Sequence, residues 1–315
     1  MSEKKDTKGY WIDAEEQQGI IFDVERFSLH DGTGCRTVVY LKGCPLHCVW
    51  CANPESQLME PQIGFYREKC AFCKNCVAVC PQGERFFKEG AVPWDACRGC
   101  QKCTEVCAYE ARVAYGKIVR AKEVVEQVLR DRIFYKHSDG GVTLSGGEVC
   151  LQPEFSKAIL YLCQKEGIHT AIETTGFCAQ EQFKSILPYV DQLLYDFKCM
   201  DSKTHKKYTG VGNEKILENA IFASKVVREM IVRFPVIPGV NDTEENVNAM
   251  ADFLLKKMPR VKCVDLLPYH SVGKSKCEKI GKVYNYEPPY ELTQERIKEL
   301  SAILCERGLE ARIGG

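Results

Sequence analysis

Three cysteines stand close together in one short loop, where Cys44, Cys48 and Cys51 have the spacing C-x3-C-x2-C directly after the β-like run 37–41. Thiolates are the ligands of iron–sulfur clusters, and a cluster of four irons normally takes four of them. A compact loop that supplies only three leaves one iron without a protein ligand, as a catalytic metal site keeps a position open for its reactant. The spacing therefore predicts a reactive 4Fe–4S cluster.

Two plainer interpretations of this loop are a structural zinc site and a set of reduced, buried thiols. Structural zinc sites usually consist of two paired C-x2-C knuckles. The loop has no such pairing and no fourth ligand in its pattern. The spacing therefore favours the iron–sulfur cluster over zinc.

A second cysteine pattern occurs twice, and the second copy begins 27 residues after the first. Each copy has the spacing C-x2-C-x2-C-x3-C, which is the signature of bacterial ferredoxins with two 4Fe–4S clusters. Zinc ribbons would instead separate two pairs by a longer linker. The repeat predicts two further clusters in a ferredoxin-like insert at residues 62–116. The ligands are Cys70, Cys73, Cys76 and Cys80 in the first copy, and Cys97, Cys100, Cys103 and Cys107 in the second.

The fourth cysteine of each copy is expected to bind the cluster of the other copy, as in two-cluster ferredoxins. In the first copy this cysteine precedes Pro81, which turns the chain away. Sequential ligation, with each copy keeping its own fourth cysteine, is the alternative. The crossed arrangement groups Cys70, Cys73 and Cys76 with Cys107, and Cys97, Cys100 and Cys103 with Cys80.

The composition sets limits on location and partners. The 315 residues are 45% hydrophobic and carry a formal net charge of zero, so no basic surface for nucleic acid or membranes is expected. The chain has no apolar run of 18 residues and no apolar signal core at its start, which predicts a cytoplasmic protein. Nineteen cysteines in a reducing compartment indicate metal binding rather than disulfides. Eleven of them fall into the three motifs, and most of the other eight are expected to be buried apolar residues.

The rest of the chain predicts an α/β fold. Residues 1–19 are polar and are expected to form a loose extension, whereas residues 20–61 and 117–315 alternate between strand and helix patterns. About six β/α units follow one another, which is too few for a closed eight-fold barrel. We therefore expect a partial, open (β/α)6 barrel with the ferredoxin-like insert. The expected strands after the insert are 141–144, 169–173, 192–197, 230–236 and 261–267, and the main helices are 152–166, 179–188, 214–225, 243–257 and 292–307.

Polar residues gather at the ends of these predicted strands. Active sites of parallel α/β folds lie at the carboxyl ends of the strands, so these residues are expected to share one site. They are Gly146-Gly147-Glu148, Glu173-Thr174-Thr175-Gly176, Asp196-Phe197-Lys198, Arg233, and Leu267-Pro268-Tyr269-His270.

Several motifs together resemble the glycyl-radical-enzyme activating enzymes of the radical S-adenosylmethionine (SAM) superfamily. They are the three-cysteine loop, the turn at 30–36, G-G-E, D-x-K-x-M-D from Asp196 to Asp201, V-x-P-G, and L-L-P-Y-H. The turn departs from the family pattern, with Thr33 in place of the usual Pro and Cys35 where Ile is common. The two-cluster insert is similar to that of the longer activating enzymes. The resemblance implies that the open iron binds SAM, and that reductive cleavage yields methionine and a 5′-deoxyadenosyl radical. This radical would take hydrogen from one glycine of a partner enzyme.

The resemblance also implies roles for individual residues. Cys44, Cys48 and Cys51 would hold the SAM cluster, and Lys198 is a further expected catalytic residue near SAM and the incoming peptide. The backbone at Gly147 would approach the methionyl amine, for which glycine is suited because it has no side chain. Glu173 and Thr174 would lie near the ribose or a monovalent cation. The full set expected to bind cofactor is Trp50, Cys51, Ala52, Gly146, Gly147, Glu148, Glu173, Thr174, Asp196, Phe197, Lys198, Arg233 and His270.

The implied partners are a glycyl radical enzyme and an electron donor of flavodoxin or ferredoxin type, with the chain itself a monomer. Residues 51–56 and the turn at 30–36 favour activators of decarboxylases over those of glycerol dehydratase, benzylsuccinate synthase, choline lyase or isethionate lyase. One alternative is a radical SAM enzyme that acts on another peptide or a small molecule. The alternative from another class is a pure electron-transfer ferredoxin, which would gain nothing from an open iron.

Overall fold

The computed structural model describes residue 11, residues 13–83 and residues 97–314. Most of the expected loose extension, residues 1–10 and 12, lies outside this range. Its remainder is not loose, which corrects the expectation for that part. Trp11 and Ala14 are buried, and the amide of Trp11 donates a hydrogen bond of 3.1 Å to the hydroxyl of Tyr161. Strand β1 already begins at Gln18.

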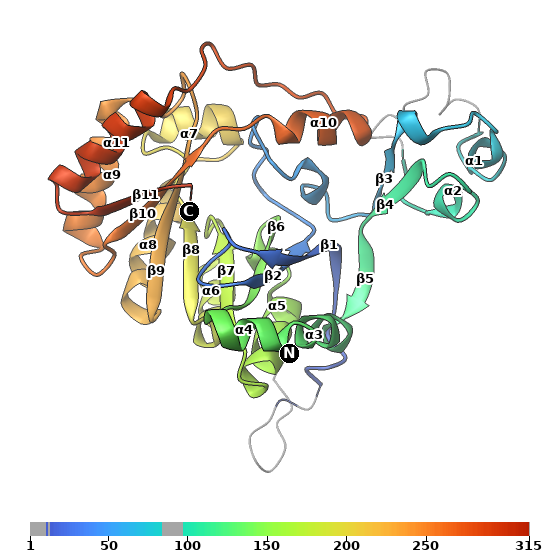
Figure 1. Cartoon of the computed structure of the whole chain (residues 1–315), viewed down its shortest axis with the longest axis horizontal. Coiled ribbons are helices and arrows are strands. Elements are labelled where there is room, and N and C mark those ends of the chain that lie inside the picture. Colours follow the sequence, from blue (N-terminus) through green and yellow to red (C-terminus); the bar gives the residue numbers. More distant parts are fainter. Residues whose placement is uncertain (1–10, 12, 84–96, 315) are drawn as a thin grey trace.

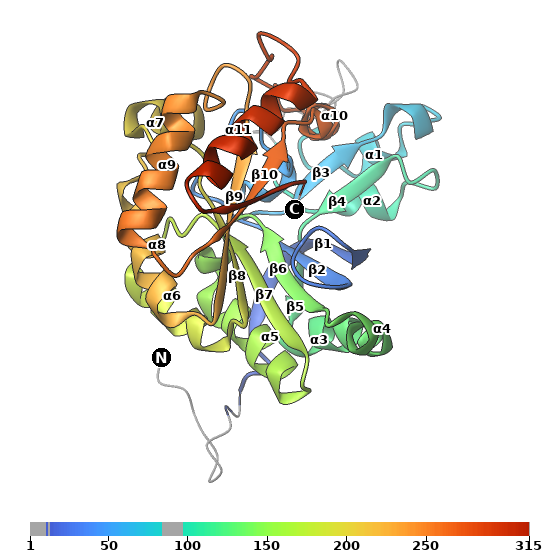
Figure 2. The same cartoon turned by 60° about the vertical axis from the view of Figure 1, so that its left-hand side comes forward.

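A nine-stranded sheet forms the main body, with the strand order β11-β10-β9-β8-β7-β6-β2-β1-β5. The seven strands from β2 to β11 in this order pair in parallel, whereas β1 and β5 add an antiparallel edge. The sheet curves into a partial barrel (Figures 1 and 2), which confirms the predicted fold class of the main body. The strands are β1 Gln18–Ser28, β2 Arg36–Leu41, β5 Lys117–Arg120, β6 Gly141–Gly146, β7 His169–Thr174, β8 Gln192–Asp196, β9 Glu229–Val236, β10 Cys263–Pro268 and β11 Glu310–Ile313.

Helices alternate with the parallel strands and cover the outer face of the sheet (Figure 2). Helix α9 begins where the Thr243 side chain accepts a hydrogen bond from the Asn246 amide, and α7 where Asp201 accepts one from Thr204. In the part of the chain that the structure describes, no helix is long and apolar enough to cross a membrane. The helices are α3 Ala121–Leu129, α4 Arg132–Ser138, α5 Pro153–Lys165, α6 Gln180–Ile186, α7 Ser202–Thr209, α8 Glu214–Val226, α9 Glu244–Lys257, α10 Val272–Lys279 and α11 Gln294–Glu306.

The core lies between the sheet and these helices. The central strands are buried on both faces, as parallel strands covered by crossover helices are. Val142 and Leu144 of β6 and Ile172 of β7 are fully inaccessible to solvent. This rigid packing fixes the strand ends, where the polar motifs begin.

A smaller two-stranded sheet projects from the barrel (Figure 1). In the sequence it lies between β2 and β5. Its strands β3 (Gln62–Phe65) and β4 (Arg112–Tyr115) pair antiparallel, with Gln62 opposite Tyr115 and Phe65 opposite Arg112. The two cysteine runs lie between these strands and carry the short helices α1 (Asn75–Ala78) and α2 (Lys102–Glu105).

Candidate active site

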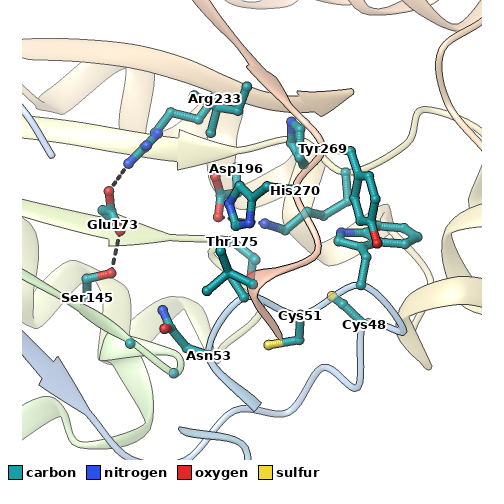
Figure 3. Close-up of a pocket in the computed structure, with 18 of the residues that line it drawn as sticks. Cys48, Cys51, Asn53, Ser145, Glu173, Thr175, Asp196, Arg233, Tyr269 and His270 are labelled. Atoms are coloured by element: carbon teal, nitrogen blue, oxygen red, sulfur yellow. Dashed lines mark hydrogen bonds and ion pairs between the residues drawn. The ribbon is translucent and has the colours of Figure 1, made fainter. Parts of the chain in front are cut away.

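A cavity of about 410 Å³ opens at the carboxyl ends of the parallel strands. The ends of β6, β7 and β8 contribute Gly146, Thr174 and Asp196, and β9 contributes Arg233. Figure 3 shows Asp196 and Arg233 among the lining side chains. Most of the polar strand ends thus meet at one cavity, whereas Glu148, Gly176 and Phe197 do not line it. Of the residues expected to bind cofactor or catalyse, those that line the cavity are Cys48, Trp50, Cys51, Ala52, Gly146, Gly147, Glu173, Thr174, Asp196, Lys198, Arg233 and His270.

The three-cysteine loop is fixed at the rim of this cavity by backbone hydrogen bonds. The amide of Cys44 donates to the carbonyl of Gln57 (3.1 Å), and the amide of His47 donates to that of Thr209, at the end of α7 (2.8 Å). Helix α10 packs on the other side, where a Cβ on Gly273 would lie 2.0 Å from the carbonyl oxygen of Cys51. The loop is thus held by elements far away in the sequence.

The three cysteines are half-buried and lie close to one another. Burial raises the pKa of Cys44 well above its ordinary value, and the neighbouring Cys48 raises it further. Burial likewise raises the pKa of Cys48 to about 12, although Lys198 opposes this rise. Iron binding must therefore displace protons from these groups. Within the described residues no three His, Cys, Asp or Glu side chains converge on a single metal ion, whereas Cys48 and Cys51 line a cavity large enough for a bigger group.

The two glycines of the G-G-E motif are required by packing against the loop. A Cβ on Gly147 would lie 2.0 Å from the carbonyl oxygen of Gly43, directly before Cys44. Gly146 has φ +98°, and its Cβ would lie 2.6 Å from the carbonyl oxygen of Leu41, its partner in the β2–β6 register. Gly147 was expected to allow a close approach of SAM, which stays a prediction. The structure adds a second reason for glycine, because the missing side chain lets the residues after strand β6 approach the cluster loop.

Glu148 was expected to contact the cofactor, but it does not line the cavity. Its side chain is 1% exposed, and its carboxylate accepts hydrogen bonds from the Thr174 hydroxyl, from the Thr175 amide (3.0 Å) and from the Thr175 hydroxyl (2.7 Å). It also accepts a bond of 3.3 Å from the Cys150 amide. Glu148 is therefore a positioning residue that joins the ends of β6 and β7.

Replacing Glu148 with Ala is expected to lower the free energy of unfolding by about 2–4 kcal/mol, because buried hydroxyl and amide donors would lose a charged acceptor. Anaerobic denaturant unfolding of the purified protein measures this, with the exposed Glu245→Ala on α9 as the control that leaves the midpoint unchanged. Glu148→Gln should lose less than the Ala variant. An unchanged midpoint together with lost SAM affinity would show instead that Glu148 contacts SAM.

The polar wall of the cavity contains a short ion pair. Lys198 Nζ lies 2.8 Å from Asp196 Oδ2, and both side chains are largely buried. Burial lowers the pKa of Lys198, but the charges of Asp196 and Cys48 outweigh this and leave the pKa above its ordinary value. Lys198 therefore stays a cation, placed between a carboxylate and the cluster loop.

A second polar group lies deeper in the barrel. Glu173 accepts a hydrogen bond from Ser145 and pairs with Arg233, whose guanidinium also lies 3.6 Å from a carboxylate oxygen of Asp31 (Figure 3). Asp31 belongs to the turn between β1 and β2, which thus reaches into the cavity. Burial lowers the pKa of Arg233, whereas Asp31 opposes this.

Aromatic side chains close the cavity near the cluster loop. Trp50 packs against Tyr208 and Tyr286, with ring centroids 6.0 and 6.1 Å apart. Phe197 was expected to contact the cofactor, but its ring is 1% exposed and packs in the core against Tyr195 and Phe253. Like Glu148, it supports the site from behind.

The cavity includes residues that the sequence analysis did not assign to it. Lys276 of α10 donates a hydrogen bond of 2.8 Å to Asn53 and lies 3.0 Å from Glu55, which ties the helix to the cluster loop. Asp31 could have been found from its place in the Gly-rich turn. The further polar residues of this kind are Tyr40, Asn53 and Ser145, whereas Thr175 and Tyr269 line the cavity as expected from their strand ends.

The cysteines of the two repeats surround two small cavities in the projecting segment. One cavity is lined by Cys70, Cys73, Cys76 and Cys107. The other is lined by Cys80, Cys97, Cys100 and Cys103. The fourth cysteine of each run thus lies with the first three of the other run. This is the grouping that crossed ligation requires.

Comparison with known proteins agrees with this geometry. Residues 38–254 match the radical SAM superfamily. The structure of Streptococcus suis SuiB bound to its precursor peptide SuiA has the same fold, with a TM-score of 0.55 at 14% identity over 88% of this chain and 48% of that one. The chain thus belongs to the radical SAM superfamily.

Curated relatives narrow the assignment. The chain is 38% identical to a (2S)-3-sulfopropanediol dehydratase activating enzyme of Klebsiella oxytoca, over 94% of this chain and 97% of the relative. It is equally similar to a 4-hydroxyphenylacetate decarboxylase activating enzyme of Clostridioides difficile, over 94% and 96% of the two chains. Within the superfamily the chain is therefore an activating enzyme of the glycyl radical enzymes, as the motifs indicated, and it uses SAM for the radical activation of a partner enzyme.

Proposed function

We propose that the 410 Å³ cavity binds SAM on a 4Fe–4S cluster held by Cys44, Cys48 and Cys51, and that the glycine loop of a partner enzyme enters beside it. The observation that carries the proposal is the convergence of Cys48 and Cys51 with Lys198 and the polar strand ends on one cavity, while Cys44 lies close to both cysteines. When bound, the cluster and SAM supply a 5′-deoxyadenosyl radical that takes hydrogen from glycine.

The residues of this chain orient the reactants. The cluster loop is pinned between α7 and α10, so the three sulfurs have fixed positions. Asp196 and Lys198 present one carboxylate and one ammonium to the charged methionyl end of SAM. Trp50 and Ala52 would border the adenine, and His270 the adenosine. The buried walls exclude water from a reactive intermediate.

Deeper in the cavity, the Glu173–Arg233–Asp31 group provides charged atoms on the side opposite the cluster loop. Glu173 and Thr174 would hold the ribose or a monovalent cation. The sheet is not closed between β11 and β5. This opening gives a peptide loop a path to the cavity that a closed barrel would lack.

The projecting segment, residues 62–116, would be a ferredoxin-like domain with two further 4Fe–4S clusters. Four cysteines around each of two cavities fit the donor set of such clusters. An external one-electron donor would reduce these clusters, which in turn reduce the SAM cluster. We expect the chain to work as a monomer in the cytoplasm, docked to the partner enzyme.

Anaerobically reconstituted protein is expected to contain about twelve irons, four for each cysteine group. Cys80→Ala should perturb only the cluster near Cys97, whereas Cys107→Ala should perturb only that near Cys70. Iron and sulfide analysis with Mössbauer spectroscopy measures both. About four irons in the intact protein, or zinc, would contradict the cluster assignment. Sequential ligation would give the reverse result, in which Cys80→Ala perturbs the cluster near Cys70 and Cys107→Ala perturbs the cluster near Cys97.

The partner is a glycyl radical enzyme of the kinds that these relatives activate, dehydratases and decarboxylases among them. Incubation of the reduced protein with SAM and such an enzyme is expected to give the EPR doublet of a glycyl radical. Omission of SAM is the control. SAM cleavage without a radical in any of these enzymes would favour a radical SAM enzyme that acts on another substrate.

A further inference from the structure

A second cavity lies beside the cluster loop. It has a volume of about 320 Å³, and Cys48 and Cys51 line both this cavity and the 410 Å³ cavity. Gln57 and Lys282 line the second cavity but not the first. Besides the proposed SAM site, Cys51 therefore faces a polar pair that the proposed function does not use.

The backbone of Gln57 is fixed within the cluster loop. Gln57 directly follows the short 3-10 turn Pro54–Ser56, and its amide donates a hydrogen bond of 3.3 Å to the carbonyl of Pro54. Its carbonyl accepts a bond of 3.1 Å from the amide of Cys44. The residue is only 4% exposed. Gln57 is thus a buried part of the loop that carries the three cysteines.

Lys282 sets the orientation of the Gln57 side chain. Its ammonium donates a hydrogen bond to Gln57 Oε1. Because an ammonium can only donate, the oxygen of the carboxamide faces Lys282 and the NH₂ group turns the other way. Lys282 follows α10, and its amide donates a bond of 2.8 Å to the carbonyl of Cys277 in that helix. Since α10 packs on the cluster loop (Figure 1), the helix that covers the loop also directs the Gln57 side chain.

The NH₂ group of Gln57 lacks an acceptor. Its Nε2 is buried, and none of the described residues accepts a hydrogen bond from it. A buried amide donor without a partner destabilises a fold, so native proteins keep few of them. The missing acceptor therefore points to a neighbouring group that becomes a better acceptor in the working protein.

The sulfur of Cys51 is such a neighbour. Burial raises the pKa of the Cys51 thiol, whereas the Asn53 amide and the Gln57 side chain, as donors to a thiolate at this position, oppose the rise. The charges of Lys198 and Lys282 act in the same direction. A thiol sulfur accepts hydrogen bonds only weakly, but a thiolate carries negative charge and accepts them well. The acceptor that Gln57 lacks is therefore the thiolate form of Cys51.

We propose that Gln57, oriented by Lys282, donates a hydrogen bond to the Cys51 thiolate and thereby raises the reduction potential of the SAM cluster. This inference rests on the proposed function, because it takes Cys51 to be a ligand of that cluster. Reduction adds one electron from an external donor, and no bond forms or breaks. The added negative charge spreads onto the ligand sulfurs, where an N–H donor and a nearby ammonium stabilise it. Gln57 acts through Cys51 and is a positioning residue that makes the cluster easier to reduce.

The test is an anaerobic potentiometric titration of the reconstituted protein with dithionite, in which EPR follows the reduced cluster whose signal changes when SAM is added. Gln57→Leu removes the N–H donor at similar size. It is expected to lower the equilibrium constant of reduction about tenfold, which is about 59 mV for one electron. Lys282→Met removes the cation that orients the carboxamide and should shift the potential in the same direction. Iron content should stay unchanged in both variants.

Gln62→Leu is the matched control. Gln62 is likewise a buried glutamine, and its Oε1 accepts a hydrogen bond of 3.1 Å from the ammonium of Lys42. Its Nε2 also has no partner among the residues that the structure describes. It lies on β3, however, and lines neither of the two cavities beside Cys51. This variant loses the same amide and should keep the potential of the SAM cluster.

An unchanged potential in Gln57→Leu would overturn the proposal. An equal shift in Gln62→Leu would also overturn it, because the shift would then be a general effect of losing a buried amide. If Gln57→Leu loses the SAM cluster, Lys282→Met decides, since a lowered potential supports the proposal and an unchanged one overturns it. Failure of the proposed function is a different result, namely that the unmodified protein has no reduced cluster whose EPR signal responds to SAM.

Discussion

Replacing Cys44, Cys48 and Cys51 together with alanine is expected to abolish the formation of 5′-deoxyadenosine when dithionite is the reductant. The three cysteines lie close together, and Cys48 and Cys51 are the cysteines that line the cavity among the described residues. Without them the site would hold no cluster and would not bind SAM through iron. Chromatography of the products after anaerobic incubation with SAM measures the loss.

A matched triple variant, Cys70, Cys73 and Cys76 to alanine, removes the same number of thiols from the projecting segment. Dithionite is small enough to reach the SAM cluster directly, so this variant should still cleave SAM while losing its activity with a protein donor. Reductive SAM cleavage by the Cys44, Cys48 and Cys51 variant would refute the assignment of the reactive cluster.

Gly147→Val is expected to cost the protein its SAM cluster as well as its SAM affinity. The added side chain would overlap the carbonyl of Gly43, which is 2.0 Å from the position of a Cβ, and would displace the loop that carries Cys44. Such overpacking costs about 1–3 kcal/mol, which corresponds to roughly fivefold to 150-fold in SAM affinity. About four irons per protein should also be lost.

Iron analysis and equilibrium binding of SAM test this prediction. Ala302→Val on the distant helix α11 is a suitable control, because this side chain is exposed and lies within a regular helix. Full iron content with weakened SAM binding would support a direct approach of SAM to Gly147. Normal iron and normal affinity would remove Gly147 from the site.

The spacing of apolar residues was sufficient to predict most strands and helices of the main body. The strands β6 to β10 and the helices α5, α6, α8 and α9 lie within a few residues of their expected positions, because buried parallel strands have continuous apolar runs. The sequence patterns did not reveal α7 and α10. Both helices are mostly polar, and α10 is positioned by contacts with the cluster loop rather than by an apolar stripe of its own.

The site was predicted as a set of residues at strand ends. The structure separates the residues of this set that line the cavity from those that support it from behind. Glu148 and Phe197 share motifs with residues that line the cavity, yet their side chains turn into the protein. A motif does not show which of its side chains faces a ligand, since neighbouring residues of a strand end point in opposite directions. Asp31 was not assigned to the site, because its pairing with Arg233 joins residues far apart in the sequence, and only its place in the Gly-rich turn marks it locally.

The measurement that tests the central claim most directly follows the abstracted hydrogen atom. A partner glycyl radical enzyme labelled with α-deuterated glycine is incubated with SAM and the reduced protein, and the 5′-deoxyadenosine is analysed by mass spectrometry. The account predicts one deuterium in the 5′-deoxyadenosine and, in parallel, a glycyl radical signal from the partner. Unlabelled 5′-deoxyadenosine, formed without a glycyl radical, would contradict it.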